Sequence, residues 1–390
     1  MKLRASTLAL ALVFSCGTPF AHAAKDAATC STGMVAVAGK CVASKEAIAK
    51  IDGIVRASMV KQDLKAVLAA VAIDGKPLLI RAWGQSMTGV PATPDMHFRN
   101  GAVAIAYMGT VLLQLCDEHV LSLDDKLSKW FPQYPKADRV TLQMLINATS
   151  GYADYVNEKI LVPPLYANPF RAWTPDELIA MGLGQPMKCE PGTCWSYAHT
   201  NFVILGKVLE KATHRNLEDL IRERILDRLA LKDTHSENAA IIQEPALHAF
   251  DGERGRYEES TYWNPSWTLA HGAIMTSSIG DVLKSATAIG TGALLSPRSR
   301  ALQVAPLTAK FKRWNDKSYY GLGVVVANGW VIQTPSFAGY AAFMGYLPSQ
   351  KLAIAVSNTL GEKASLEGNR STDLAGEIAK YLAPDMPLQY

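Results

Sequence analysis

The fold of this chain is decided around the segment FRNGAVAIAY, at residues 98–107. Asn100 belongs to a residue type favoured at helix N-caps, and the run that follows it through Leu115 carries no charge. The segment therefore predicts a loop that leads into a buried central helix. The first turn of that helix would direct unpaired N–H groups and the positive end of the helix dipole toward a nucleophile or an anion. Ala102 and Ile105 stand in this turn, where nucleophilic chemistry would need a hydroxyl and an amine.

Patterns typical of β-strands occur on both sides of this segment. Residues 67–73 and 77–83 are apolar, and Asp74-Gly75-Lys76 between them predicts a hairpin turn. Four runs near the C-terminus, each closed by Asn, Gly, Pro or Ser, also predict strands, at residues 320–327, 329–333, 341–346 and 352–358. The strands of one sheet are therefore expected to come from both ends of the chain.

Helical periodicity fills the middle of the chain. Residues 139–231 are mainly helical in pattern, most clearly at 201–211 and 217–229. A helix is also expected near Ser122, which resembles a capping pair with Asp125. Residues 251–264 show little periodicity and are expected to form a loop. Further helices are expected at residues 44–61, 277–294 and 372–382, the second of them beginning with Ser278.

The order of these elements indicates an α+β fold class. One antiparallel sheet would be built from both termini and flanked by helices, with an inserted all-helical lobe and a cleft between sheet and lobe. The predicted divisions are a signal peptide at 1–24, a short Cys-stapled extension at 25–43, and a main domain at 44–385. Within that domain the sheet lobe takes about 44–97 and 280–385, and the helical lobe about 98–279.

The first 24 residues have the pattern of a secretory signal peptide. Lys2 and Arg4 precede a short apolar run, and Ala21-His22-Ala23 predicts cleavage near Ala23. The run is too short to span a bilayer, so no stable membrane span is expected. Phe14 fits a lipid-attachment pattern at Cys16 badly, and lipidation is not favoured. The mature protein is expected to be exported, either periplasmic or secreted.

Charge and composition exclude several function classes. The formal net charge of +4 falls to +2 once Lys2 and Arg4 leave with the leader, and no basic run of the kind that nucleic acid selects is present. No cluster of Cys, His and carboxylate residues and no glycine-rich phosphate loop is visible, so no metal and no cofactor are expected. The partner class that remains is a small molecule or a ligand like peptidoglycan.

Export changes how the cysteines are interpreted, because oxidising compartments favour disulfides. Cys189 and Cys194 bracket a turn that brings its ends together, which predicts a local bridge. Cys30 and Cys41 are expected to staple the N-terminal extension in the same way. Cys116 is then left as a buried, inert thiol.

Several ordered motifs point to one known family. Four of them are FRNGA at 98–102, LINATSG at 145–151, EPGTCWSY at 190–197 and YGLG at 320–323. Four more are SLDDK at 122–126, NFVILG at 201–206, GAIMTS at 272–277 and LLSP at 294–297. Over roughly residues 45 to 385, this order and spacing resembles the serine β-lactamase and penicillin-binding-protein superfamily, in its branch of class C β-lactamases, D-aminopeptidases and family VIII esterases.

The resemblance implies three catalytic motifs, and all three are altered here. The family's S-x-x-K, a Ser nucleophile with a Lys one helix turn later, falls on Ala102 and Ile105. Its Y-x-N falls on Tyr197-Ala198-His199, which keeps the Tyr and replaces the Asn. Its strand motif of H-x-G or K-T-G type falls near Gln333-Thr334-Pro335, where the basic or imidazole side chain is missing. Because all three motifs are changed together, we interpret the site as one that no longer performs acyl-enzyme chemistry.

Two literal copies of these motifs occur elsewhere in the chain. Ser58-Met59-Val60-Lys61 satisfies S-x-x-K, but the resemblance places it on a helix packed against the sheet, so chance is the better account. Tyr155-Val156-Asn157 likewise matches Y-x-N in the wrong place. Three serines are expected near the cleft as loop or capping hydroxyls rather than nucleophiles: Ser150, Ser196 and Ser336.

The residues that remain predict a binding site more readily than a nucleophile. The backbone N–H of Ala102 persists whatever its side chain, and Tyr197 and His199 are candidates for acid–base work. The set expected to contact a ligand comprises Arg99, Asn100, Ala102, Gln333, Tyr340, Trp263 and Trp267.

Three functions are compatible with this sequence. The first is a ligand-binding pseudoenzyme, exported and without acyl-enzyme chemistry. The second is a non-covalent acid–base enzyme of lyase or isomerase type that uses His199 and Tyr197. The third is an esterase or peptidase of the ordinary family type with an unrecognised nucleophile. A standard serine β-lactamase, esterase or DD-peptidase is not expected.

Overall fold

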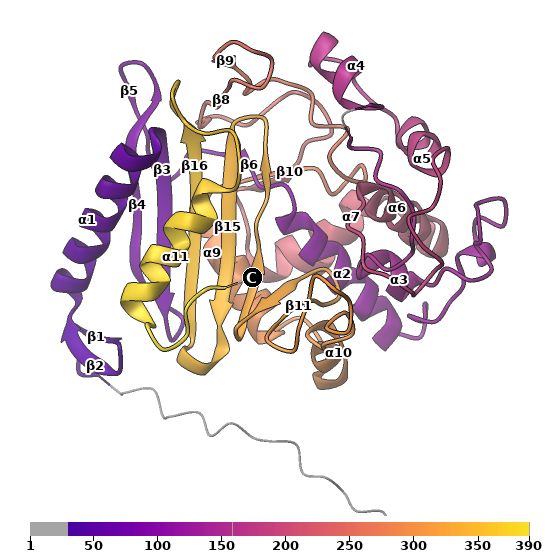
Figure 1. Cartoon of the computed structure of the whole chain (residues 1–390). Helices are drawn as coiled ribbons and strands as arrows, with labels where there is room; N and C mark the ends of the chain where they lie inside the picture. The colour runs from indigo at the N-terminus through magenta and orange to yellow at the C-terminus, as the bar shows by residue number, and fades with distance from the viewer. Residues whose placement is uncertain (1–29, 158, 390) are drawn as a thin grey trace, which may run out of the picture.

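The computed structural model describes residues 30–157 and 159–389 (Figure 1). The predicted signal peptide at 1–24 lies outside these residues, as do residues 25–29 of the predicted extension. The described part of that extension is a hairpin of β1 (Met34–Val37) and β2 (Lys40–Ala43). A disulfide between Cys30 and Cys41 closes it.

A nine-stranded sheet forms the centre of the molecule, in the order β11-β12-β13-β15-β16-β3-β4-β5, with β14 paired to β15. Strands of the N-terminal part are β3 (Leu64–Ile73), β4 (Lys76–Met87) and β5 (Val90–Pro91). Those of the C-terminal part are β11 (Ser318–Tyr320), β12 (Val325–Ala327), β13 (Trp330–Gln333), β14 (Ser336–Phe337), β15 (Tyr340–Leu347) and β16 (Leu352–Leu360). Antiparallel pairing of β16 with β3 joins the two ends of the chain into one sheet.

The hairpin predicted at Asp74 and Gly75 is confirmed. Ile73 pairs with Lys76, and the two residues between them have φ of 50° and 73°. Positive φ at both central positions matches the right-handed twist of the strands, which explains why Asp-Gly is so strong a hairpin signal. The local sequence therefore fixes the register of β3 against β4.

Helices cover both faces of the sheet (Figure 1). On one face, α1 (Ser44–Gln62) packs on β3 and on α11 (Arg370–Leu382), which lies along β15 and β16. On the other face, α9 (Ile279–Thr291) contacts β3, β15 and β16. The predicted start of this helix at Ser278 is confirmed: Ser278 is the N-cap of α9, and its hydroxyl accepts from the Asp281 N–H.

The segment between the two parts of the sheet holds most of the helices. They are α2 (Val103–Asp117), α3 (Leu142–Ile146), α4 (Val162–Ala167), α5 (Pro175–Leu183), α6 (His199–Thr213), α7 (Leu217–Ile221), η2 (Arg222–Leu226), α8 (Asp227–Leu229) and, after α9, α10 (Pro297–Gln303). The apolar α2 is central: it contacts α6, α7, α9 and α10, and its residues from Val103 through Leu115 are buried.

This segment is not wholly helical. A three-stranded sheet is formed by β6 (Phe98–Arg99), β10 (Met275–Ser277) and β7 (Thr234–Ser236). A second pair, β8 (Phe250–Asp251) and β9 (Glu258–Glu259), lies within the region expected to be loop. Strands of two or three residues are too short to show an alternating pattern, which is why the sequence did not reveal them.

Two predicted helix starts are wrong. Ala102, not Asn100, is the N-cap of α2, and the Asn100 side-chain amide donates to the Ser277 hydroxyl of β10. No α-helix begins at Ser122: its N–H donates to the Asp125 carboxylate in a turn, and only the short 3₁₀ helix η1 (Leu127–Lys129) follows. Within the described residues, no helix is both long and apolar enough to cross a membrane.

Candidate functional site

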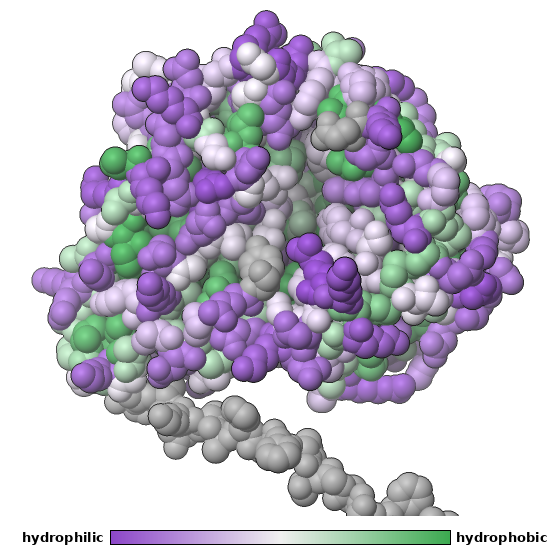
Figure 2. Space-filling model, in the orientation of Figure 1, coloured by the Kyte–Doolittle hydropathy of each residue, from purple (hydrophilic) through white to green (hydrophobic). Residues whose placement is uncertain are grey.

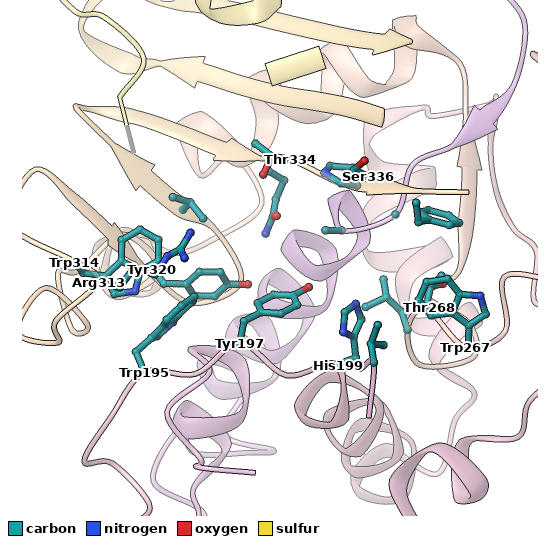
Figure 3. Close-up of a pocket in the computed structure, with 18 residues that line it drawn as sticks. Trp195, Tyr197, His199, Trp267, Thr268, Arg313, Trp314, Tyr320, Thr334 and Ser336 are labelled. Atoms are coloured by element: carbon teal, nitrogen blue, oxygen red, sulfur yellow. The ribbon is translucent and has the colours of Figure 1, made fainter. Parts of the chain in front are cut away.

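A cavity of about 460 Å³ lies where the N-terminal end of α2 meets β13, β14 and the start of α6 (Figure 3). The face shown in Figure 2 is hollowed between the sheet and the helices. We call this cavity the central pocket. Its lining residues are Gly101, Ala102, Val156, Trp195, Tyr197, His199, Trp267, Thr268, Leu269, Arg313, Trp314, Tyr320, Val325, Gln333, Thr334, Pro335, Ser336 and Phe337.

The start of α2 brings a backbone donor to the pocket. Ala102 lines the pocket, and its N–H makes no hydrogen bond to an acceptor in the described part of the chain. Gly101 precedes it with φ of 50°, and a Cβ there would lie 2.6 Å from Pro335 Cβ, so the residue before β14 approaches this turn too closely for a side chain. Ile105, one turn later, is fully buried and is not among the lining residues.

His199 is held at the pocket by a carboxylate that the sequence did not reveal. The Asp154 carboxylate lies 3.0 and 3.1 Å from His199 Nδ1 and accepts the His199 backbone N–H at 3.0 Å. His199 Nε2 makes no hydrogen bond to any described residue. Asp154 is 45 positions away in sequence and belongs to no periodic pattern, so only the tertiary fold identifies it.

Tyr197 forms the floor beside this pair. Its ring meets the His199 ring edge-on, with centroids 5.2 Å apart, and the Tyr320 ring lies 6.5 Å away. Burial is the largest cause that raises the pKa of the Tyr197 hydroxyl well above its usual value. The nearby Tyr320 and Asp154 act in the same direction with smaller effects. The hydroxyl therefore stays neutral and able to donate at ordinary pH.

Aromatic side chains make up both ends of the pocket (Figure 3). At one end Trp195 packs edge-on against Trp314 at 4.9 Å, and the Arg313 guanidinium lies 5.5 and 5.3 Å from these two rings. At the other end Trp267 packs edge-on against Phe337 at 6.1 Å. The middle, with Tyr197 and His199, is polar.

The structure brings five of the predicted site residues together and leaves four apart. Ala102, Tyr197, His199, Trp267 and Gln333 line the pocket, and the Gln333 amide also donates to the Gly323 carbonyl at 2.7 Å. The four outside it, contrary to the expectation that they line the cleft, are Arg99, Asn100, Trp263 and Tyr340.

Each of these four side chains has a partner elsewhere. Arg99 is buried and donates to the carbonyls of Ala240 and Thr261, and burial lowers the pKa of its guanidinium. Tyr340 donates its hydroxyl to the Leu247 carbonyl at 2.6 Å. Trp263 packs under the guanidinium of Arg254, and the Asn100 amide is used by Ser277.

Most residues considered as alternatives to the family motifs lie outside the central pocket. Ser58 lies on α1, away from the pocket, and its hydroxyl accepts from Gln62. Tyr155, of the second Y-x-N copy, donates its hydroxyl to the Trp267 carbonyl. Ser150 is buried against Asn201, and neither it nor Ser196 lines the pocket. Ser336 does line it.

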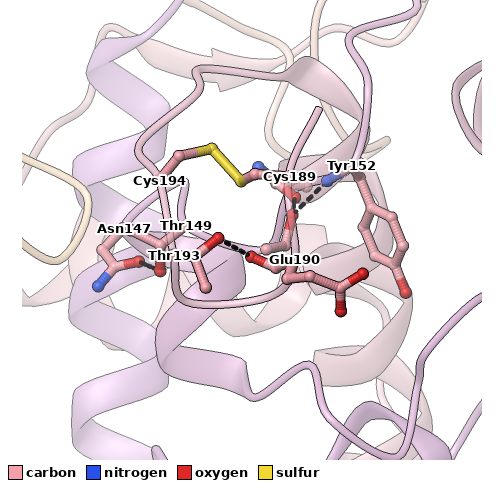
Figure 4. Close-up of a disulfide and its surroundings, with 9 residues drawn as sticks. Asn147, Thr149, Tyr152, Cys189, Glu190, Thr193 and Cys194 are labelled. Atoms are coloured by element: carbon pink, nitrogen blue, oxygen red, sulfur yellow. Dashed lines mark hydrogen bonds between the residues drawn. A yellow bond between two sulfur atoms is a disulfide. The ribbon is translucent and has the colours of Figure 1, made fainter. Parts of the chain in front are cut away.

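A disulfide supports the wall that carries Trp195 and Tyr197. Cys189 and Cys194 are bonded as the sequence predicted (Figure 4). The loop between them donates the Gly192 N–H to the Thr149 carbonyl at 2.8 Å, and Lys188 and Ser196, on either side of the loop, donate to the carbonyls of Gly151 and Ala148. Cys116 has a free thiol whose pKa burial raises to about 11, so it is not a nucleophile at neutral pH.

The part of the chain that the structure describes contains no group of three or more His, Cys, Asp or Glu side chains placed to hold a metal ion.

A family model described as Beta-lactamase matches residues 51–377. The chain belongs to the Beta-lactamase family. Among curated proteins, Penicillin-binding protein 4 of Amycolatopsis lactamdurans is 24% identical over 77% of this chain and 81% of its own length. D-aminopeptidase of Brucella anthropi is 32% identical over 50% of this chain and only 35% of its own length.

Solved structures of the Beta-lactamase fold superpose over most of the chain. A D-stereospecific amidohydrolase from Streptomyces sp. has a TM-score of 0.74 at 22% identity, covering 86% of this chain and 98% of that one. D-amino acid amidase from Ochrobactrum anthropi SV3, complexed with L-phenylalanine amide, has a TM-score of 0.73 at 20% identity, covering 87% and 98%. At such identities the likeness establishes the fold alone.

Proposed function

We propose that this Beta-lactamase-family chain binds a small ligand in the central pocket and forms no acyl-enzyme. The observation that carries the proposal is the start of α2: Ala102 faces the pocket where the family resemblance expects a nucleophile, and Ile105 is buried where it expects a base. Ala has no atom that attacks a carbonyl, and Ile neither takes nor gives a proton. The chain would then be a ligand-binding pseudoenzyme.

The pocket supports binding without covalent chemistry. Its aromatic ends offer apolar surface, and the free N–H of Ala102 offers a donor to a carbonyl or carboxylate. The names of the relatives, D-aminopeptidase and amidase, favour a ligand with an amide or peptide-like group, including fragments like peptidoglycan. The signal-peptide pattern together with two disulfides supports export to a periplasmic or extracellular location.

Active-site probes test the absence of an acyl-enzyme. The full chain should remain unlabelled by a fluorescent fluorophosphonate and by a labelled penicillin, as read from intact mass and peptide mapping. A D-amino acid amidase of the family, treated in parallel, should label with the fluorophosphonate. Covalent label on a pocket serine, Ser336 above all, would overturn the proposal in favour of an ordinary hydrolase with an unrecognised nucleophile.

A second function, non-covalent acid–base catalysis of lyase or isomerase type, is favoured by one contact. Tyr197 and His199, predicted as the acid–base pair, line the same pocket with rings in edge-on contact at 5.2 Å. A neutral imidazole is a competent base near pH 7, and the neutral Tyr197 hydroxyl is a donor.

A further inference from the structure

We propose that Asp154 and His199 form a water-activating pair, which makes the central pocket a non-covalent hydrolase of esters or amides. The proposal rests on the proposed function in one respect, that the pocket holds no covalent nucleophile. It departs from the pseudoenzyme role by assigning a reaction to the pocket, and it names a positioning residue, Asp154.

The imidazole of His199 is oriented by three contacts to one carboxylate. Asp154 lies within 3.1 Å of Nδ1 through both of its oxygens and also accepts the backbone N–H of His199. Because a carboxylate only accepts, the ring proton belongs on Nδ1 and the lone pair on Nε2. The side chains of Asp154 and His199 are 23% and 21% exposed, so the pair is largely shielded from solvent.

A capping role for Asp154 at the start of α6 does not account for this geometry. Capping needs an acceptor for a backbone N–H, which one carboxylate oxygen supplies. The ring contact is additional, and aromatic neighbours fix the ring plane: Tyr197 at 5.2 Å, Tyr155 at 5.9 Å and Trp267 at 6.4 Å. Nε2 is left without a protein partner on a side chain that lines the pocket.

The same pocket offers a donor for the negative charge that develops on a carbonyl oxygen. The Ala102 N–H has no acceptor among the described residues and lies at the positive end of α2, a helix of 15 residues. The proposed reaction requires that a carbonyl whose oxygen accepts from this N–H presents its carbon to a water molecule held by His199 Nε2, and both residues line the same pocket.

The reaction needs no group beyond water and the substrate. His199 Nε2 takes a proton from water as the water oxygen bonds to the carbonyl carbon, and the C=O π pair moves to the oxygen that faces Ala102. The tetrahedral intermediate then re-forms C=O and breaks the bond to the leaving oxygen or nitrogen, which takes the proton from Nε2. The products are a carboxylic acid and an alcohol or amine. Asp154 touches neither water nor substrate.

Pocket chemistry narrows the substrate class. None of the described lining residues is acidic, and Arg313 supplies a positive charge at the Trp195 end. The pocket therefore favours a neutral or anionic ester or amide that carries an aromatic or alkyl group, because an ammonium group would find no carboxylate partner on the lining.

Hydrolysis of p-nitrophenyl acetate and p-nitrophenyl phenylacetate by the full chain tests the assignment. The wild-type rate should exceed the His199→Gln rate by about 10²-fold or more, the usual contribution of a general base. Asp154→Asn keeps an acceptor for the backbone N–H but offers an amide donor to Nδ1, which moves the ring proton to Nε2. Its kcat should fall by a similar factor with KM little changed. His214→Gln, at the exposed C-terminal end of the same helix, is the matched control and should keep the wild-type rate.

The pH dependence of kcat/KM distinguishes a positioning role of Asp154 from a purely structural one. The ionisable groups that face the His199 ring are Asp154, Tyr155 and Tyr197. Wild-type kcat/KM should rise through one imidazole titration, and Asp154→Asn should displace or abolish that limb while circular dichroism and thermal unfolding show a folded chain.

The experiments distinguish failure of the hydrolase proposal from failure of the proposed function. A wild-type rate no higher than that of His199→Gln, or full kcat in Asp154→Asn, overturns this proposal and leaves the ligand-binding function standing. An acyl adduct detected by intact mass during turnover overturns the proposed function itself, because it reveals a covalent nucleophile.

Discussion

Ile105 shows at the scale of one residue how far this site lies from acyl-enzyme chemistry. It is fully buried on the first turn of α2, and the turn packs tightly: a Cβ on Gly323 would lie 2.7 Å from the Ile105 carbonyl oxygen. The Ile105 side chain itself belongs to the hydrophobic core. A lysine there would bring a charge into that core.

We expect Ile105→Lys to lower the free energy of unfolding by roughly 3 kcal/mol or more, the scale of an uncompensated buried charge. Ala102→Ser, three positions earlier, points a hydroxyl at the pocket and should change it by less than about 0.5 kcal/mol. Urea unfolding of both variants and of the wild type measures these changes in the free energy of unfolding. If Ile105→Lys were as stable as Ala102→Ser, a solvated slot for the family's lysine would still exist, and the pocket would be closer to acyl-enzyme chemistry than we propose.

At the scale of single elements, the disulfide of Cys189 and Cys194 is placed to hold the pocket wall. Trp195 follows Cys194 directly, and the loop is bonded to residues 148–151 (Figure 4). Replacing both cysteines with serine should cost about 2 kcal/mol, as expected for a very short closed loop. It should also weaken ligand binding, because the aromatic end of the pocket loses its support.

The matched control is the disulfide of Cys30 and Cys41, which closes the β1–β2 hairpin and contributes no pocket residue. Its Cys→Ser pair should lower the free energy of unfolding without changing affinity. Quenching of tryptophan fluorescence by N-acetyl-D-phenylalanine, which carries no ammonium group, would report binding. Equal affinity in both double variants would show that the Cys189–Cys194 loop does not shape the pocket.

Elements with local signals were predictable from sequence, and those made by distant contacts were not. The β3–β4 hairpin and the Ser278 cap of α9 each depend on residues within a few positions. Asn100 carries an equally good capping signal, yet its amide is taken by Ser277, 177 positions away. Asp154 reaches His199 across 45 positions. Family motifs located Ala102, Tyr197 and Gln333, whereas Arg99 and Tyr340 are taken by the carbonyls of residues distant in sequence.

At the scale of the whole molecule, the inserted segment is docked onto the sheet through a buried acid. Asp251, in β8, is 2% exposed; it accepts the Glu253 N–H at 2.6 Å and a hydrogen bond from the Gly339 backbone between β14 and β15. Burial, with smaller contributions from the charges of Glu253 and Glu258, raises the pKa of its carboxyl to about 6, although the two backbone hydrogen bonds act in the opposite direction. No described cation forms an ion pair with it.

The raised pKa makes stability depend on pH in a defined direction. Between the ordinary carboxyl value of 3.8 and about 6, the folded chain holds the Asp251 proton and the unfolded chain does not. Asp251 therefore makes its most favourable contribution below the unfolded pKa and loses it as pH rises to about 6, above which the contribution is constant. The loss is at most about 3 kcal/mol, at 1.36 kcal/mol for each pKa unit.

Carboxyls with lowered pKa values, such as Asp52 and Glu118, change stability with pH in the opposite direction. The pH dependence of the wild-type free energy of unfolding therefore does not isolate the contribution of Asp251. Asp251→Asn keeps an acceptor for the Glu253 N–H and removes the titration. The wild-type free energy of unfolding minus that of Asp251→Asn should fall between pH 4 and pH 6 and stay level from pH 6.5 to 8, when both are measured by urea unfolding. A difference that is flat across the whole range, or that rises with pH, would show that the carboxyl is ionised in the folded chain and that the segment is docked by an ion rather than by a neutral acid.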